Sequence, residues 1–475
     1  MKFGRWKGLL VLLFTFALVA AACSGDEVTE AAEDAVDAAD EAADDAADTA
    51  EEAVDETEEA VDDATGDDAM ADTGVITVTG SIRSEEEAGA IQDVLDAWGA
   101  ENGVEVTYTG SADWEAEVNV ALEGGTEPDI SIFPQPGKLA DFARAGHMAV
   151  IPDDVVASVA SNWDPGSVGF GTVDGAQYGV PDKTDLKSLV WYQPARFEAL
   201  GYSVPQTWDE LVALTDQAIA DGNTPWCVGI ESGQATGWPF TDWVEDVMLR
   251  TAGPEAYDQW TSGELPFADP QVVGAMETVK ELWDKPGAVF AVGGSISATN
   301  FGDNGEPLVN GECLMHRQAN FFAAFFPEGT PAADGSEGAV DVFYLPGDGT
   351  SRPVLVAGTL WGAFHDRPEV MALMEYVGSP EYANARQAAQ KARLGGPGTL
   401  SGFLSGVQGI DLSLWEPLEQ SMLKIMADAE VARFDGSDLM PADVGAGTFW
   451  SEGTSFINGD KSAADAATAI DASWP

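Results

Sequence analysis

The chain has 475 residues and is strongly acidic, with 82 Asp and Glu against 21 Lys and Arg and a formal net charge of −61. Nucleic acid is not expected as a partner, because phosphate binding needs clustered basic residues. The three His and three Cys lie far apart and form no ligand-spaced cluster, so we predict no metal and no cofactor. The length predicts more than one core, and therefore two domains or lobes.

Residues 1–22 have the pattern of a secretory signal peptide, with a basic start and an apolar run from Leu9 to Ala22. The apolar run is short for a membrane span. The small residues before Cys23 resemble a bacterial lipobox, although Ala20 stands where leucine is usual. We predict cleavage before Cys23 and a lipid on its sulfur. An ordinary cleaved signal is the alternative.

An acidic, alanine-rich segment follows from Ser24 to Thr73 and holds 22 of the acidic residues and none of the basic ones. Its apolar residues are too small to bury much surface, and its like charges repel one another. We therefore predict that residues 23–74 comprise the lipidated cysteine and an extended stalk. A cation-binding role for this stalk is the alternative.

The rest of the chain opens with a β-α-β-α-β rhythm. The pattern predicts strands at 75–79, 104–108 and 129–133, and helices at 86–99 and 114–123. This rhythm is typical of a parallel sheet with helices on its faces. Ligands bind such sheets outside the carboxyl ends of the strands. The loops at Gly80–Ser84 and Phe133–Pro136 are therefore candidate ligand-binding segments.

Two cysteines, Cys227 and Cys313, remain in the body of the chain. Cysteines of an exported protein can pair, because disulfides persist outside the cell. We predict a Cys227–Cys313 disulfide, with two separate buried thiols as the alternative.

Several phrases together resemble a known family. They are EPDISIF from Glu127, GVPDKTDLKSLVWYQPARFEALGYSVPQTWDELVAL from Gly179, GECLMHRQANFF from Gly311 and FWSEGTSFINGDKSAADAATAI from Phe449. Their order is similar to that of the family 1 extracellular solute-binding proteins, the sugar-binding components of ABC importers, which include maltose-binding protein. The phrases PWCVGIES and GECLMHRQ are most similar to the α-glucoside-binding branch of that family.

The resemblance implies an α/β, two-lobe periplasmic-binding-protein-like fold of type II, with a hinge between the lobes. The segment Val180 to Leu189 is expected to cross the hinge, and Val342 to Pro346 to return as a strand to lobe one. The implied ranges are 75–183 and 340–378 for lobe one, and 184–339 and 379–475 for lobe two.

The resemblance also implies a function without covalent chemistry. A monomer anchored to the outside of the bacterial membrane through Cys23 would capture a sugar, an α-glucoside or an oligosaccharide, and deliver it to an ABC permease. One alternative is the same fold with a polyamine, a peptide or glycerol phosphate as ligand. Another is a secreted glycosidase, which would need two carboxylates about 5–10 Å apart.

Sugar binding needs aromatic faces for the ring and polar groups for its hydroxyls. By resemblance, Trp450 in FWSEG matches a stacking aromatic, and Trp238, Phe240 and Trp243 in GWPFTDW are further candidates. Core packing is the alternative for each of these rings. The polar candidates are Gln135, Arg83 and Ser84 from lobe one, Lys183 and Asp185 at the hinge, and Arg317 and Gln318 after the strand that follows Cys313.

Overall fold

The computed structural model describes residues 74–333, 335–349, 351–396 and 398–475. The predicted signal peptide, Cys23 and all of the predicted stalk except Gly74 lie outside these residues. Residues 74–475 form one compact unit. Among the described residues, no helix is both long and apolar enough to cross a membrane.

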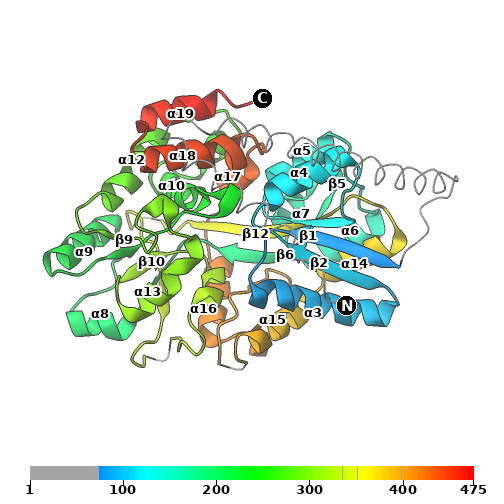
Figure 1. Ribbon diagram of the computed structural model, residues 1–475, viewed down its shortest axis with the longest axis horizontal. Helices are drawn as coiled ribbons and strands as arrows, with labels where there is room; N and C mark the ends of the chain where they lie inside the picture. Colours follow the sequence, from blue (N-terminus) through cyan, green and yellow to red (C-terminus); the bar gives the residue numbers. More distant parts are fainter. Residues whose placement is uncertain (1–73, 334, 350, 397) are drawn as a thin grey trace, which may run out of the picture. The chain divides into compact units, whose positions relative to one another are not determined.

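A six-stranded sheet contains the predicted opening of the body (Figure 1). Its order is β13-β12-β3-β1-β2, with β6 paired to β12, and β1 runs parallel to β2 and β3 while β12 runs antiparallel to β3 and β6. The three predicted strands are confirmed as the first three of this sheet. The strands are β1 (Val75–Gly80), β2 (Glu105–Gly110), β3 (Ile130–Phe133), β6 (Gly179–Leu186), β12 (Val354–Ala363) and β13 (Ala432–Phe434).

The periodicity of the buried side chains explains how the first strand and the first helix pack together. Ile76 and Val78 of β1 are buried, and so are Ile91 and Leu95 at helical spacing on α3 (Glu85–Asn102). Ser84 caps this helix, because its hydroxyl accepts a hydrogen bond from the Glu87 N–H at 3.1 Å. The cap fixes the short loop between β1 and α3, which becomes part of the cavity described below.

A second sheet has five strands in the order β11-β7-β10-β8-β9. In it β7 runs antiparallel to β10 and β11, whereas β8 runs parallel to β9 and β10. The strands are β7 (Leu189–Tyr192), β8 (Trp226–Cys227), β9 (Val289–Phe290), β10 (Met315–Arg317) and β11 (Asp341–Tyr344). Two short strands, β4 (Thr172–Val173) and β5 (Ala176–Gln177), pair separately.

Helices cover both sheets. The predicted helix at 114–123 is confirmed as α4 (Trp114–Gly124). Thr207 caps α9 (Trp208–Ala220), because its hydroxyl accepts a hydrogen bond from the Glu210 N–H. The other α-helices of the described residues are α5 (Pro136–Arg144), α6 (Asp153–Ala160), α7 (Pro165–Gly169), α8 (Pro194–Leu200), α10 (Trp238–Thr251), α11 (Pro254–Thr261), α12 (Pro270–Trp283), α13 (Gly305–Asn310), α14 (Pro368–Val377), α15 (Pro380–Arg393), α16 (Pro417–Ala427), α17 (Gly436–Leu439), α18 (Trp450–Ile457) and α19 (Ala463–Asp471).

The chain passes from the first sheet to the second at Lys187 and Ser188, between β6 and β7. This point lies inside the segment expected to cross between lobes. Strand β12 runs beside the crossing: the Lys187 N–H donates to the Leu355 carbonyl, and the Leu355 N–H donates to the Ser188 hydroxyl, both at 2.8 Å. The passage between the two sheets is therefore held to Leu355 of β12 by two hydrogen bonds.

Parts of the expected division of the chain are wrong. The strand expected at 342–346 to rejoin the first sheet is β11, which pairs with β7 in the second sheet instead. Two segments of the range given to lobe two lie with the first sheet: α15 packs against α3, and β13 pairs with β12. The physical reason is that long-range pairing, which a local pattern does not encode, decides which sheet a strand joins.

The predicted disulfide between Cys227 and Cys313 is confirmed, with Cα atoms 5.5 Å apart. It links the end of β8 to the segment that leads into β10, its parallel neighbour. Because the two cysteines are 86 residues apart in sequence, the bond closes a long loop within the second sheet.

Candidate functional site

A cavity of about 380 Å³ is lined by residues of the six-stranded sheet and of the loops and helices that adjoin the two sheets. Both loops proposed from the sequence contribute to it: Ser81 to Ser84 follow β1, and Pro134 and Gln135 follow β3. These are carboxyl ends of parallel strands, where α/β sheets bind their ligands. The opposite side is supplied by residues around α10, α17 and α18, among them Trp238, Asp438 and Trp450.

One wall of the cavity is aromatic. We call it the aromatic wall, and its four half-buried rings are Trp238, Phe301, Phe321 and Phe325. They pack on one another, with ring centroids of Trp238 and Phe301 5.0 Å apart and those of Phe301 and Phe325 5.3 Å apart. Such a wall gives a ligand an apolar surface, and the packing of the rings on one another fixes their orientation.

The protein's own cations lie against this wall. The Arg83 guanidinium is 6.0 Å from the centroid of the Phe301 ring, and the Lys183 ammonium is 5.7 Å from that of Phe321. The Lys187 ammonium is 5.3 Å from the Trp238 ring. These distances are typical of cation–π contacts, so the rings of the wall already contact cations of the protein itself.

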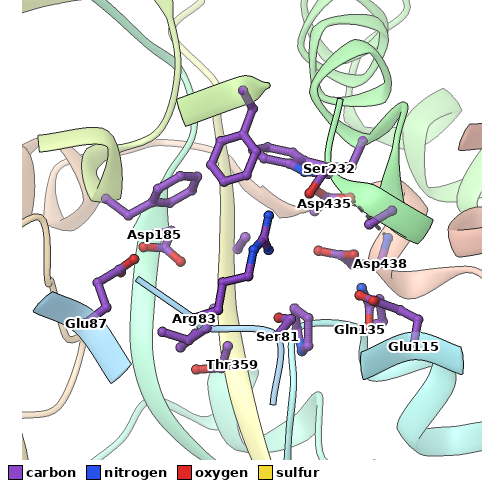
Figure 2. A pocket seen from close by; sticks show the side chains of 18 of the residues that line it. Ser81, Arg83, Glu87, Glu115, Gln135, Asp185, Ser232, Thr359, Asp435 and Asp438 are labelled. Atoms are coloured by element: carbon purple, nitrogen blue, oxygen red, sulfur yellow. Dashed lines mark hydrogen bonds between the residues drawn. The ribbon is translucent and has the colours of Figure 1, made fainter. Parts of the chain in front are cut away.

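The cavity side formed by Glu87, Lys183 and Asp185 is internally paired. Lys183 forms a salt bridge with Asp185 at 2.9 Å, and Asp185 also accepts a hydrogen bond from Asn320. Burial raises the pKa of Glu87, although the neighbouring Lys183 opposes this. In Figure 2, Glu87 and Asp185 lie on one side of Arg83.

Three other residues lie on the far side of Arg83 in Figure 2, and we call Glu115, Gln135 and Asp438 the polar corner. Gln135 is 3% exposed and its Oε1 has no hydrogen-bond partner, and the Glu115 Oε2 is likewise buried and unpaired. Burial raises the pKa of Glu115, with Lys138 and Gln135 partly opposing it. Burial and the charge of Asp435 raise the pKa of Asp438 well above its usual value.

A buried charge network lies behind the cavity. The Lys187 ammonium forms salt bridges with Asp242, at 2.9 Å, and with Asp435. Burial raises the pKa of Asp242 to about 6. Burial also pushes the pKa of Asp435 upward, but Lys187 more than offsets this and lowers it to about 2. Lys187 thus ties the crossing between the sheets to α10 and to the start of α17.

Asp242, Glu245 and Asp435 place carboxylate oxygens within 4.8 Å of one another, as metal ligands do. Each of them is already paired, however. Lys187 bridges the two aspartates, and Glu245 accepts the N–H groups of Gly436 and Ser437 at 2.9 and 3.0 Å. The cluster therefore has its own cation, and we assign no metal to it.

Seven of the predicted ligand-binding residues line the cavity. One of them is Trp450, whose buried Nε1 has no hydrogen-bond partner. Trp450 is 3% exposed and belongs to none of the hydrophobic core clusters. The seven are Arg83, Ser84, Gln135, Lys183, Asp185, Trp238 and Trp450.

The other four predicted residues are not among the residues that line the cavity. Phe240 and Trp243 are core residues of α10, where Trp243 packs on Trp226 and Trp283. Arg317 pairs with Asp242 and Asp246 in the buried network, and the Gln318 side chain accepts the Ala319 N–H. We leave these four out of the candidate site. Helical periodicity places Phe240 and Trp243 on α10 without saying which face meets the cavity.

Sequence reasoning missed several lining residues. Phe301 and Phe325 lie in short 3₁₀ segments, Phe301–Asn304 and Asn320–Phe325, which have no periodic signal. No sequence signal distinguished Glu115 and Asp438 from the other acidic residues in the body of the chain, which has 60 in all. The phrase NFF, noted in the sequence, did contain Phe321 of the aromatic wall.

Comparisons with known proteins agree with this geometry. Residues 83–384 match the family model described as bacterial extracellular solute-binding protein. An osmoprotective compounds-binding protein of Synechocystis sp. is 38% identical over 84% of this chain and 92% of its own length. An α-glucosides-binding periplasmic protein of Rhizobium meliloti is 37% identical over 84% of this chain and 86% of its own length.

Solved structures share the fold. A chitin oligosaccharide binding protein superposes with a TM-score of 0.70 at 17% identity, covering 86% of this chain and 98% of that one. Maltose-bound MalE3 of T. maritima superposes with a TM-score of 0.63 at 19% identity, covering 84% of this chain and 98% of that one.

Proposed function

Because the chain belongs to the bacterial extracellular solute-binding proteins, we propose that it is the sugar-binding component of an ABC importer and takes a small α-glucoside into the cavity. The observation that carries this proposal is the composition of the cavity. An aromatic wall faces buried polar atoms without partners, among them Gln135 Oε1 and Trp450 Nε1. A sugar offers both an apolar C–H face and hydroxyl groups, and so matches both kinds of surface.

The size of the cavity favours a short ligand. Ligand pockets are typically about 300–1,000 Å³, and about 380 Å³ lies near the lower limit. A mono- or disaccharide fits this volume better than a long oligosaccharide. The printed names of the two similar relatives, one for α-glucosides and one for osmoprotective compounds, support a small organic solute.

Charged ligands are less favoured. A polyamine would have to share the aromatic wall with Arg83, Lys183 and Lys187, which already lie within 6.0 Å of ring centroids. A phosphate would need free cations, whereas Lys183 and Lys187 are already paired with aspartates. A neutral sugar avoids both conflicts.

We propose that the ligand binds one lobe first and that the two lobes then close on it about the segment near Lys187. A contact between the two sides supports this: the Ala442 N–H, beyond α17, donates to the Asp141 carboxylate of α5 at 2.9 Å. A ligand that contacts both sides stabilises the closed arrangement, which is a population shift. In this proposal the two lobes have the ranges expected from the sequence, with two changes. Strand β11 belongs to lobe two, and α15 and β13 belong to lobe one.

We also propose that a lipid on Cys23 anchors the protein outside the membrane as a monomer and that the acidic stalk gives it reach to the permease. The support is the sequence pattern of residues 1–73. Cys23→Ser should release the protein into the medium, whereas wild type should stay with the membrane fraction. An unlipidated wild-type N-terminus in mass spectrometry would contradict the anchor.

A thermal-shift screen tests the ligand class. The panel contains maltose, sucrose, trehalose, glycine betaine, spermidine and glycerol phosphate. A ligand far above its Kd should stabilise the protein by about 3–4 kcal/mol. We expect shifts only with the α-glucosides. A shift with spermidine or glycerol phosphate alone would contradict a sugar ligand, and turnover of nitrophenyl α-glucoside would contradict a pure binding role.

A further inference from the structure

The polar groups of the cavity fall into two classes. On the side of Lys183 and Asp185, the charged groups satisfy one another, because the ammonium and the carboxylate are 2.9 Å apart. In the polar corner, Gln135 Oε1 and Glu115 Oε2 are buried and unpaired. A buried polar atom without a partner costs about 1–3 kcal/mol, so a protein keeps such atoms where a ligand supplies the missing bonds.

The polar corner draws its members from both sides of the cavity. Gln135 follows β3 and Glu115 lies in the first turn of α4, both on the side of the six-stranded sheet. Asp438 belongs to α17, which packs on α10, and it lines the same cavity as Glu115 and Gln135. Figure 2 shows Asp438 facing Glu115 and Gln135. A ligand in this corner therefore touches both sides at once.

The charge state of the corner decides what it can bind. Burial raises the pKa of both Glu115 and Asp438. A protonated carboxyl group donates one hydrogen bond and accepts others, as the Gln135 amide does. Groups that both donate and accept match sugar hydroxyls, which have the same dual character.

We propose that Glu115, Gln135 and Asp438 bind hydroxyls of the terminal glucosyl ring as uncharged hydrogen-bonding groups, while the second unit of the ligand faces Arg83 and the aromatic wall. The inference rests on the proposed function and adds the orientation of the ligand. It makes this corner the part of the site that determines which ring hydroxyls are recognised.

Titration calorimetry tests the proposal with whichever of maltose, sucrose and trehalose binds wild type most tightly. Glu115→Ala, Gln135→Ala and Asp438→Ala should each lower affinity at least tenfold. Glu115→Gln and Asp438→Asn should stay within about threefold of wild type, because an amide replaces an uncharged acid well. The matched controls Glu117→Gln and Asp443→Asn alter exposed carboxyls nearby and should bind as wild type.

Analogues of the same sugar, each lacking one hydroxyl of the terminal ring, make the test independent of folding. Wild type should bind at least one of them tenfold more weakly, and an alanine variant of the corner should lose nothing further with that analogue. Additive losses for every analogue, alanine variants that bind as wild type, or amide variants as weak as alanine variants would overturn the proposal. If wild type binds none of the three sugars, the proposed function itself fails.

Discussion

Buried polar side chains fall into a paired set and an unpaired set. Behind the cavity, Lys187 neutralises Asp242 and Asp435, and breaking such a buried pair typically costs about 3–5 kcal/mol. Facing the cavity, Trp450 Nε1 and Gln135 Oε1 lack partners. The paired set supports the fold, and those unpaired atoms that lie on residues lining the cavity are available to a ligand.

Trp450→Phe should separate these roles. Phenylalanine keeps an apolar ring but removes the unpaired Nε1–H, so we expect the melting temperature to stay level or rise slightly and α-glucoside affinity to fall about 3- to 10-fold. Trp260→Phe is the control, because Trp260 has the same unpaired atom within the core of the second sheet. Equal affinity of Trp450→Phe and wild type would make Trp450 a packing residue.

His316 should make stability depend on pH. Its pKa is lowered from 6.5 to about 4, chiefly by burial; the hydrogen bond with the Cys227 carbonyl opposes this, and the charge of Arg317 adds to it. Between those values the unfolded chain binds more protons than the folded one, so this contribution is complete above pH 6.5 and is lost as the pH falls to 4. It amounts to about 3 kcal/mol.

Denaturant unfolding of wild type and His316→Gln from pH 4 to 7.5 measures this contribution. The stability difference between the two should shrink as the pH falls, whereas His147→Gln, at an exposed position, should leave the curve unchanged. Parallel curves for wild type and His316→Gln would show that His316 does not titrate differently on folding.

At the scale of elements, α5 and α17 approach each other from opposite sides of the cavity. A Cβ atom on Gly137 of α5 would lie 1.9 Å from the carbonyl oxygen of Met440, just beyond α17. Only glycine allows this approach, because backbone atoms cannot yield as a flexible side chain can. The contact between the two sides therefore depends on a residue without a side chain.

Gly137→Ala should hold the two sides apart and lower α-glucoside affinity at least tenfold, while the unfolding temperature of the ligand-free protein changes little. Calorimetry measures the affinity. The control is Gly274→Ala in α12, where a Cβ meets nothing within 4 Å and the helix should gain about 0.5–1 kcal/mol. Wild-type affinity in Gly137→Ala would refute the dependence of binding on this contact.

At the scale of the molecule, the sequence was most informative where the pattern is local. The alternation in β1 and the periodicity of α3 predicted the opening of the first sheet, and the loops after β1 and β3 line the cavity as expected. The placement of β11 failed, because its antiparallel pairing with β7 joins segments about 150 residues apart. Phe301 and Phe325 of the aromatic wall were missed, because they lie in two short 3₁₀ segments that meet each other and Trp238 of α10 only in the fold.

The central claim is that the cavity between the two sheets binds a small α-glucoside. Titration calorimetry of the purified wild-type protein with maltose, sucrose and trehalose tests it most directly. We predict saturable one-site binding of at least one of them, with a negative heat-capacity change from burial against the aromatic wall. Saturable binding of a charged solute, together with no heat from any of the three sugars, would contradict the account.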